Sequence, residues 1–373
     1  MTGPTALQAE LRTIIAGEGP ITVARYMALC LGHPKHGYYV TRDPLGSAGD
    51  FTTAPEISQM FGELLGLWAA AAWQSMGRPL PFTLAELGPG RGTLMADALR
   101  AGSKVPGFRE ALEVHLVETS LVLRARQQAT LDAGGIQAQW HRTVAELPDG
   151  PLIVVANEFF DALPIHQAIR TDSGWHERLV GIGDAGKLTF AAHPVSLPGM
   201  EFGPQTAQGS VSTAVWEWRD DAILRELCER VVRCGGAILI IDYGHAQSCY
   251  GDTLQAMRAH SFTDPLEAPG ECDLTAHVDF AALSRSALGA GARVHGPVTQ
   301  GEFLHSLGIV TRADRLKLAA THDQGVAIDA AVARLTGTAA SEMGELFKVI
   351  ALAHPDLSPP PGFEAAPTSE RIA

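Results

Sequence analysis

The chain has 373 residues, of which 46% are hydrophobic, and a formal net charge of −13. This length allows one large domain or two smaller ones. The negative charge argues against a nucleic-acid partner, because phosphate binding needs concentrated Lys and Arg. No apolar run approaches the length of a membrane span. The N-terminal residues have the pattern of neither a secretion signal nor a transit peptide, so we expect a cytoplasmic location.

The N-terminal part of the chain is predicted to be helical. Residues 5–16 and 21–31 have the apolar spacing of amphipathic helices, and a longer helix is expected over 57–76. Between them, residues 32–55 form a glycine-rich loop region. We expect residues 1–80 to make up a helical section with a loop that borders a cleft.

From residue 82 the pattern alternates between strand and helix. This alternation predicts a mostly parallel sheet with helices on both faces. Residues 81–354 are expected to form this domain, with insertions at about 166–220 and 251–311. The predicted strands are 82–87, 113–118, 136–140, 151–156, 237–242 and 347–353.

The two insertions and the tail differ from this alternation. Short alternating runs over 166–195 predict antiparallel hairpins. Residues 251–311 are rich in loops, with helical stretches near 277–288 and 300–307. The segment 355–373 is rich in Pro and Ala, and we expect it to be a mobile tail.

The cysteines and histidines give no sign of a metal site. The five cysteines include no C-x-x-C pair, which favours reduced thiols over a disulfide framework. His33 and His36 lie close together in the sequence, but no further Cys or His pattern completes a set of ligands. We therefore expect no metal.

The most informative segment follows the first predicted strand, in the sequence Glu86-Leu87-Gly88-Pro89-Gly90-Arg91-Gly92-Thr93. Its glycines let the backbone turn tightly and approach a ligand, and the helix that follows directs unpaired N–H groups toward that ligand. Glu118 ends the next strand, where a carboxylate can accept both hydroxyls of a ribose. The two features indicate an adenosine-containing cofactor.

The glycine spacing narrows the choice of cofactor. A dinucleotide fingerprint would have its third glycine where this chain has Thr93, and no Lys-Ser/Thr pair of a P-loop follows. The E-x-G-x-G-x-G pattern with a strand-end acid resembles the first motifs of class I S-adenosylmethionine-dependent methyltransferases. We predict that the cofactor-binding residues are Glu86, Gly88, Pro89, Gly90, Gly92, Thr93, Glu118, Thr119, Ser120 and Asn157.

Acidic, amide and aromatic side chains follow the strand at 151–156, in the sequence from Asn157 to Pro164. They can be a capped helix start, with Asn157 as the N-cap, or part of an active site. We favour the second interpretation, because ligands bind beyond the carboxyl ends of parallel strands. Asp242 and Tyr243 end the strand at 237–242, where a simple turn explains them nearly as well.

At these residues the chain resembles the MidA-like methyltransferases, whose mitochondrial relatives are respiratory complex I assembly factors that act as protein-arginine methyltransferases. The resemblance implies an α/β fold: a Rossmann-like class I methyltransferase with a mostly parallel seven-stranded sheet, its last strand antiparallel, and a smaller lobe from the N-terminal section and insertions. It also implies that the loop 49–59 lines the cleft. The matching segments are 37–39, 49–59, 86–93, 117–120, 157–164, 241–244, 252–256 and 273–280.

The preferred hypothesis is methyl transfer from S-adenosylmethionine to an arginine of a protein acceptor, with S-adenosylhomocysteine as product. By family resemblance, a respiratory complex I subunit is the suggested acceptor. Glu158 and Asp161 would neutralise the guanidinium and Asn157 would orient it, so these are the predicted catalytic residues. The predicted substrate-binding residues are Asp50, Phe51, Asp242 and Tyr243.

Two alternatives remain open at this point. The enzyme can instead methylate a small molecule or a carboxylate, although the same acids would repel an anionic acceptor. The chain can also be a non-catalytic complex I assembly factor that keeps the cofactor pocket.

Overall fold

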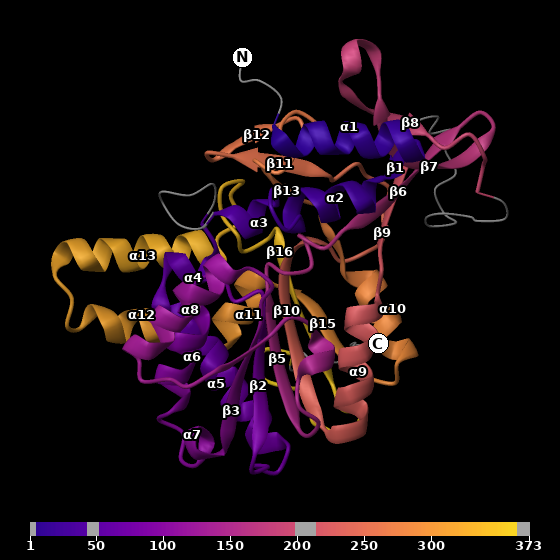
Figure 1. Cartoon of the computed structure of the whole chain (residues 1–373). Coiled ribbons are helices and arrows are strands. Elements are labelled where there is room, and N and C mark those ends of the chain that lie inside the picture. The colour runs from indigo at the N-terminus through magenta and orange to yellow at the C-terminus, as the bar shows by residue number, and fades with distance from the viewer. Residues whose placement is uncertain (1–4, 43–51, 198–213, 364–373) are drawn as a thin grey trace, which may run out of the picture.

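The largest element of the computed structural model is a sheet of seven strands in the order β15-β16-β10-β5-β2-β3-β4 (Figure 1). The structure describes residues 5–42, 52–197 and 214–363. Strands β4 to β10 along this order are parallel, and β16 is antiparallel to both of its neighbours. The strands are β2 (Phe82–Leu87), β3 (Leu112–Val117), β4 (Gln139–His141), β5 (Leu152–Asn157), β10 (Gly236–His245), β15 (Arg293–Thr299) and β16 (Phe347–Ala353).

This order confirms the predicted class I methyltransferase sheet, with its antiparallel last strand. A short additional strand, β14 (Val278–Asp279), pairs in parallel with the end of β10. Strands β2 and β16 have the predicted boundaries, and those of the other four predicted strands differ by one to three residues, with β10 continuing to His245. The reason for that extension is tertiary, because its last two residues pair with β14.

Helices cover both faces of this sheet and bury its strands. Side chains alternate between the faces, so Val155 of β5 packs in one core and Val154 in the other. Because both faces are covered, β2 and β5 are buried at every residue, which explains their unbroken apolar runs. The first core includes α5 (Gln59–Ser75) and α6 (Thr93–Gly102), and the second includes α9 (Ala222–Cys234) and α10 (Phe280–Gly289).

Above the carboxyl ends of the strands lies an upper lobe (Figure 1). Its core joins α1 (Ala6–Glu18) and α2 (Val23–Gly32) to residues from two small sheets. This is the smaller lobe implied by the resemblance. The sheets contain β1 (Ile21–Thr22), β6 (Ile165–Thr171), β7 (Gly174–Ile182), β8 (Leu188–Ala192) and β9 (Val215–Arg219), and β11 (Gln255–Arg258), β12 (Ser261–Thr263) and β13 (Asp273–Thr275).

The antiparallel pairing of β6, β7 and β8 confirms the hairpins predicted over 166–195. The segment 251–311 is more regular than expected, because it contains β11 to β15, and β15 belongs to the central sheet. Strand β15 was missed because its partner β16 lies about fifty residues later, and the run is only partly buried. The helix α5 packs on the central sheet and not in the upper lobe.

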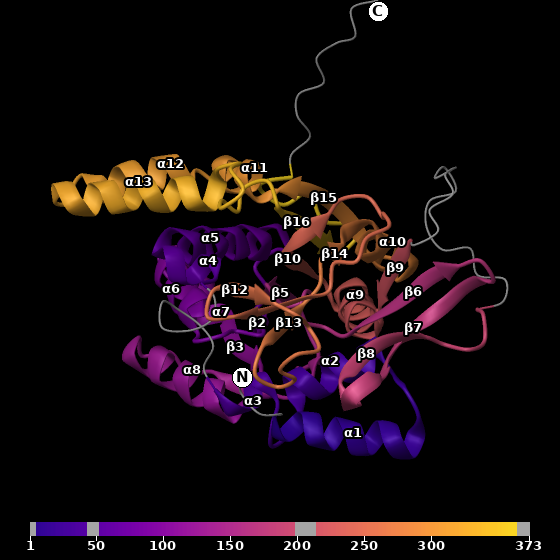
Figure 2. The same ribbon diagram turned by 90° about the horizontal axis from the view of Figure 1, so that it is seen from above.

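Two helices that the sequence analysis did not predict form a projecting hairpin. Figures 1 and 2 both show α12 (Ile309–Lys317) and α13 (His322–Thr336) extending away from the body. Leu335 is the only residue of α13 that is buried, so the helix has little apolar periodicity to reveal it. The remaining helices are α3 (Tyr38–Thr41), α4 (Ala54–Ile57), α7 (Phe108–Ala111), α8 (Leu121–Ala133) and α11 (Gln300–Ser306).

The expected mobile tail is described only as far as residue 363. That part is packed, since the ring of Phe363 lies 5.4 Å from the ring of Phe303. The rest of the predicted tail, 364–373, lies outside the described residues.

Candidate active site

The glycine turn connects β2 to α6 in a conformation that requires glycine. Gly88, Gly90 and Gly92 have φ values of 60°, 53° and 81°, in the left-handed region that side chains with a Cβ rarely adopt. A Cβ on Gly88 would lie 3.0 Å from the ring of Phe159. Gly92 is the N-cap of α6 and has no capping side chain, so N–H groups of the first helical turn other than that of Met95, which bonds to Glu86, can face a ligand.

Glu86 lies in β2 just before this turn. Its side chain is buried and its Oε2 atom has no hydrogen-bond partner. Burial raises the pKa of Glu86 to about 8, although a backbone N–H bond at Met95 opposes the increase. A buried acceptor beside a glycine turn fits a ligand that carries an ammonium group, as S-adenosylmethionine does.

Glu118 follows β3 at the same edge of the sheet. One of its carboxylate oxygens accepts from the backbone N–H of Ser120 at 2.7 Å, and the other accepts from Gln127 Nε2 at 3.1 Å. The side chain is only 8% exposed, and burial raises its pKa. The carboxylate is therefore held by donors in a fixed position beside the glycine turn, which fits a role in binding hydroxyl groups.

Ser120 links this edge to the upper lobe. Its hydroxyl donates to the backbone carbonyl of Tyr39 at 2.6 Å, and its Oγ also caps α8 by accepting from Leu123 N. Thr119 is exposed, and its backbone N–H donates to the Glu118 carboxylate. These contacts give both residues a role in holding Glu118, and their predicted contact with the cofactor stays a prediction.

Thr93 and Glu56 connect the glycine turn to α4. The hydroxyl of Thr93 donates to Glu56 at 2.6 Å, and Arg91 forms an ion pair with the same carboxylate at 3.6 Å. Glu56 lies in the segment 49–59 that the resemblance placed at the cleft, but the sequence analysis did not select it as a site residue. Asp50 and Phe51 lie outside the described residues.

The loop after β5 brings together the three predicted catalytic residues. Glu158 has a φ of 49°, which is an uncommon and strained value for a residue with a side chain. Its Oε1 atom accepts from Ala54 N and from Asn157 Nδ2, both at 3.2 Å. Asn157 Oδ1 and Asp161 Oδ1 are buried and have no hydrogen-bond partner. These two acceptors can receive donors from a ligand.

Asp242 supports this loop from β10. Its Oδ2 atom accepts from the backbone N–H of Phe160 at 3.0 Å and of Asp161 at 3.1 Å, and its Oδ1 atom accepts from Tyr243 N at 2.9 Å. The side chain is fully buried. Both oxygens are used within the protein, so the geometry gives Asp242 a positioning role in place of the predicted contact with substrate.

Several acidic groups are buried together at this point. Burial, and then the neighbouring charge of Asp161, raise the pKa of Glu158 to about 8. Burial likewise raises the pKa of Asp161 and of Asp242. Asp273 of β13 adds a further carboxylate, which accepts from the Tyr39 hydroxyl at 2.8 Å. We call Glu158, Asp161, Asp242 and Asp273 the acidic cluster.

Arg219 and Tyr243 border the acidic cluster. The Arg219 guanidinium donates to the backbone carbonyls of His277 at 2.8 Å and Ala276 at 2.5 Å, and burial lowers its pKa. The hydroxyl of Tyr243 donates to Asp161. A cavity of about 370 Å³ lies next to Arg219 and Phe160, and its wall includes His245 of β10. This cavity provides space on the β10 side of the loop.

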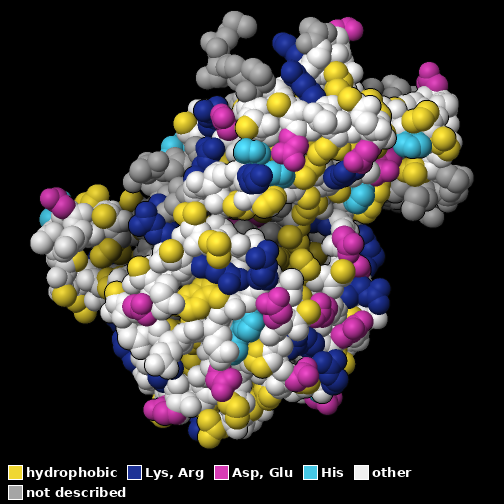
Figure 3. Space-filling view, viewed as in Figure 1, with side chains coloured by type: hydrophobic (Ala, Val, Ile, Leu, Met, Phe, Trp, Pro, Cys, Tyr) yellow, Lys and Arg dark blue, Asp and Glu magenta, His cyan; other side chains and the backbone are white. Residues whose placement is uncertain are grey.

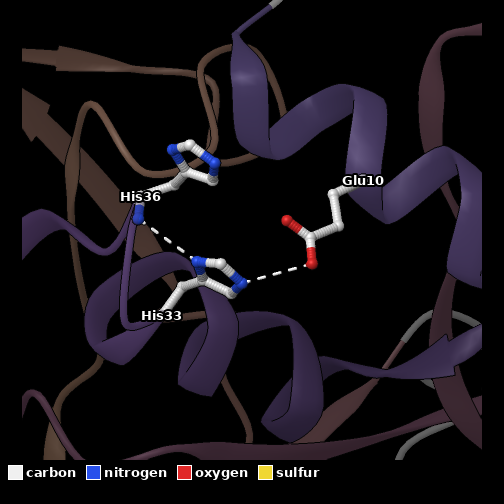
Figure 4. Close-up of side chains that lie close together, drawn as sticks. All are labelled: Glu10, His33 and His36. Carbon is white, nitrogen blue, oxygen red and sulfur yellow. Dashed lines mark hydrogen bonds and ion pairs between the residues drawn. The ribbon is translucent and has the colours of Figure 1, made fainter.

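A group of potential metal ligands lies in the upper lobe, away from this edge. Ligand atoms of Glu10, His33 and His36 lie within 4.8 Å of one another (Figure 4). His33 Nδ1 accepts from the backbone N–H of His36 at 3.2 Å, so its Nε2 carries the proton that faces Glu10 at 3.3 Å. Hydrogen bonding explains this cluster, and the expected lack of a metal stays a prediction.

The glycine turn, Glu86 and Glu118 lie together at one edge of the sheet, which we call the cofactor edge. Comparison with known proteins agrees with its geometry. Residues 64–298 match the family described as "Putative S-adenosyl-L-methionine-dependent methyltransferase". A crystallised protein from Burkholderia thailandensis, bound to S-adenosyl-homocysteine, is 31% identical, with a TM-score of 0.80. The match covers 96% of this chain and 94% of that chain.

Curated relatives extend the comparison. The mouse protein named "Protein arginine methyltransferase NDUFAF7, mitochondrial" is 41% identical over 83% of this chain and 75% of its own length. The Drosophila melanogaster homologue is 36% identical over 97% of this chain and 89% of its own.

These names correct the expected cytoplasmic location, which is wrong by this comparison, because the curated relatives are named as mitochondrial proteins. The expectation rested on a few N-terminal residues, and a targeting segment is short and separate from the folded domain. Among the described residues, no helix combines the length and apolar character needed to cross a bilayer.

The glycine turn, the strand-end Glu118 and the unpaired Glu86 oxygen fit S-adenosylmethionine, and the matches extend over nearly the whole chain. The chain therefore belongs to the MidA-like family of S-adenosylmethionine-dependent methyltransferases.

Proposed function

We propose that this enzyme methylates an arginine side chain of a protein acceptor, and that a respiratory complex I subunit is that acceptor. The observation that carries the proposal is the acidic cluster, which lies at the carboxyl edge of the sheet beside the glycine turn. Two acceptor atoms of this edge, Asn157 Oδ1 and Asp161 Oδ1, have no partner. The printed names of the curated relatives, which are protein arginine methyltransferases, support the same acceptor.

The cofactor contacts follow from the same edge. Glu118 would accept the ribose hydroxyls, and the Gly88–Gly92 turn would approach the methionine part of the cofactor. The unpaired Oε2 of Glu86 would accept from the ammonium group. Binding of this cation would favour the ionised form of Glu86, whose pKa burial raises to about 8.

S-adenosylmethionine supplies an electrophilic methyl group on a positively charged sulfonium. The residues of the enzyme must therefore hold a second cation, the guanidinium, close to the first. Glu158 and Asp161 would neutralise that charge, and Asn157 Oδ1 would accept one N–H so that a nitrogen lone pair faces the methyl carbon. After transfer, Glu158 would take the proton that the methylated nitrogen releases.

The buried acids of the site favour a cationic acceptor more strongly than the charges on the outer surface do. Figure 3 shows acidic and basic side chains interspersed over one face of the molecule, so this face has no field of a single sign. Within the site, burial raises the pKa of Glu158 and of Asp161, so the protein alone does not fully stabilise their negative charges. A bound guanidinium would supply the missing compensation, whereas a carboxylate acceptor would increase the repulsion.

Labelling with tritiated S-adenosylmethionine tests the acceptor. The substrate is a lysate of cells that lack the enzyme, so that the natural acceptor is unmethylated. We expect a labelled protein that yields labelled methylarginine on hydrolysis. Label in a small molecule or in a base-labile methyl ester would overturn the arginine assignment. Absence of transfer by a protein that binds S-adenosylhomocysteine would favour the assembly factor.

Glu158→Gln and Asp161→Asn test the role of the acidic cluster. Each change keeps the size of the side chain and removes one charge, which should cost about 2–5 kcal/mol in transfer. Calorimetry should show nearly unchanged affinity for S-adenosylhomocysteine. Glu229→Gln, on the exposed face of α9, is the matched control and should transfer at the wild-type rate. Wild-type transfer by both cluster variants would leave these acids as a loop-capping feature.

A further inference from the structure

Gln127 is a fully buried polar residue of α8 that no sequence motif singled out. Its Nε2 atom donates to the backbone carbonyl of Gly90 at 2.8 Å and to Glu118 Oε2 at 3.1 Å. Its Oε1 atom accepts from Trp140 Nε1 at 2.8 Å. The two amide hydrogens and the carbonyl oxygen of Gln127 are therefore all engaged.

The hydrogen bonds also determine which way the amide faces. In the opposite orientation, the Gln127 oxygen would face the Gly90 carbonyl and the Glu118 carboxylate, and three acceptors would repel one another. Trp140 of β4 can only donate, so it selects the observed orientation. The amide thus has one arrangement in which every polar atom is satisfied.

The backbone of α8 also contacts the glycine turn at this residue. A Cβ on Gly92 would lie 3.3 Å from Gln127 Cα, so helix and turn are in direct packing contact. One residue therefore meets the turn at Gly90 and Gly92 and meets the strand-end acid at Glu118. In the proposed function, these two parts bind the methionine and the ribose of the cofactor.

We infer that Gln127 is a positioning residue for the cofactor, which holds the Gly88–Gly92 turn and the Glu118 carboxylate at a fixed separation. The inference rests on the proposed ribose contact of Glu118. Gln127 does not need to touch the cofactor, because it acts through two groups that do. Trp140 has a supporting role, since it orients the amide.

An electrostatic consequence separates this role from simple packing. Burial raises the pKa of Glu118, and donors from Ser120 N, Gln127 and Thr119 N oppose the increase. Arg124 of α8 lowers it further, through its charge. The backbone N–H of Glu118 donates to the backbone carbonyl of His141, at the end of β4. Burial lowers the pKa of the His141 side chain. Removing the Gln127 donor should therefore raise the pKa of Glu118.

Gln127→Met tests the inference, because it keeps the length of the side chain and removes both donors. Calorimetry should show at least tenfold weaker binding of S-adenosylhomocysteine. An analogue without ribose hydroxyls should lose less affinity, so that discrimination between the two ligands decreases. As the pH is lowered, the variant should begin to lose affinity at a higher pH than the wild type does, because its Glu118 is protonated at a higher pH.

Three further variants complete the design. Gln128→Met changes the neighbouring exposed glutamine, which bonds only to Asp132 at 2.6 Å among the described contacts, and should bind as the wild type does. Trp140→Phe keeps the Gln127 donors but frees the amide, and should produce the same changes to a smaller degree. It tests the inference even if Gln127→Met does not fold. Glu118→Ala is the reference for complete loss of ribose discrimination.

Wild-type affinity and ribose discrimination in a folded Gln127→Met protein would overturn the inference. If Glu118→Ala loses discrimination and the Gln127 and Trp140 variants keep it, the ribose contact stands and the positioning role fails. If Glu118→Ala keeps discrimination, the proposed ribose contact and this inference both fail. None of these outcomes depends on methyl transfer, so they are separate from the test of the acceptor.

Discussion

At the scale of single residues, the site is defined by buried carboxyl groups whose ionised form the protein does not fully stabilise. Glu86 and Glu158 both have pKa values raised to about 8, and burial is the largest cause for each. Such groups cost stability near neutral pH and become useful when a cationic ligand supplies the missing charge. Two predictions follow from the direction of these shifts.

The first concerns stability. Unfolded Glu86 ionises near pH 4.5, whereas the folded protein keeps the proton until about pH 8. The contribution of this group to stability is therefore full below pH 4.5 and is lost as the pH rises to about 8. Relative to Glu86→Gln, the wild type should lose up to about 1.4 kcal/mol per pH unit in that window.

Urea unfolding of both proteins at pH 5 and pH 8 measures this difference. Glu110→Gln, at an exposed glutamate of α7, is the control and should follow the wild type at both pH values. A stability difference between wild type and Glu86→Gln that does not change with pH would show that Glu86 ionises normally in the folded protein.

The second prediction concerns the reaction. If the ionised form of Glu158 must hold the guanidinium, transfer should increase with pH up to the pKa of about 8. Under conditions of low acceptor concentration, the rate should rise about tenfold per pH unit below that value and level off above it. Glu158→Gln should lose this dependence, and a flat wild-type profile between pH 6 and pH 9 would contradict the assignment.

At the scale of elements, the cofactor edge depends on close packing between α5 and α6. Gly66 of α5 lies so near α6 that a Cβ would be 2.1 Å from the carbonyl oxygen of Ala98. The contact holds α6, whose N-terminus belongs to the glycine turn, against α5. A side chain at Gly66 would therefore displace α6 as a whole, since backbone atoms on the other side cannot yield.

Two glycine-to-alanine changes within helices test this packing. Gly66→Ala should lower the free energy of unfolding by about 1–3 kcal/mol, the usual cost of overpacking. Gly17→Ala in α1 meets nothing within 4 Å and should raise it by about 0.5–1 kcal/mol, because alanine loses less conformational entropy in a helix. Equal effects of the two changes, measured by urea unfolding, would disprove the close contact.

At the scale of the whole molecule, the site is assembled from the sheet and the upper lobe together. Ser120, which follows β3 of the sheet, donates to the Tyr39 carbonyl of the upper lobe, and Tyr39 in turn donates to Asp273 of β13. Glu158, which follows β5, accepts from Ala54 N of α4. Residues 81 to 234 positions apart in the chain thus meet at one edge. A ligand bound there contacts groups that only the complete fold brings together, so binding should stabilise the entire protein.

Thermal unfolding measures this coupling. S-adenosylhomocysteine at one hundred times its Kd should add about 2.7 kcal/mol to the stability of the wild type. Gly90→Val should abolish the ligand-induced increase in Tm, because a branched side chain would stand where the backbone must approach the ligand. The variant also strains a left-handed position, since Gly90 has a φ of 53°.

Gly186→Val is the matched control for that strain. Gly186 has a φ of 71°, lies in a surface turn and has nothing within 4 Å of its Cβ position. Both variants should lose stability without ligand, by about 1–2 kcal/mol for the unfavourable backbone. Only Gly186→Val should keep the ligand-induced increase. An undiminished increase in Gly90→Val would contradict the placement of the cofactor.

The sequence by itself determined the fold class and the edge at which the site lies. Strands covered on both faces leave short unbroken apolar runs, and a turn that needs left-handed backbone leaves glycines at Gly88, Gly90 and Gly92. Such signals are local, because each depends on neighbours within a few residues. The positions of the glycine turn and of Glu118 could therefore be predicted before any contact was known, whereas the order of the strands, and β15 itself, came only from the structure.

Only the tertiary structure decided how the polar groups of the site are divided between ligand and protein. Asp161 and Asp242 are both acids near predicted strand ends in the sequence, yet the oxygens of Asp242 accept three backbone N–H groups, whereas Asp161 keeps one free acceptor atom. Gln127 carried no signal at all, because its partners, Gly90 and Trp140, lie 37 residues before it and 13 after it. Hydrogen bonds and burial depend on which segments meet in space, and that is set by the packing of the whole chain.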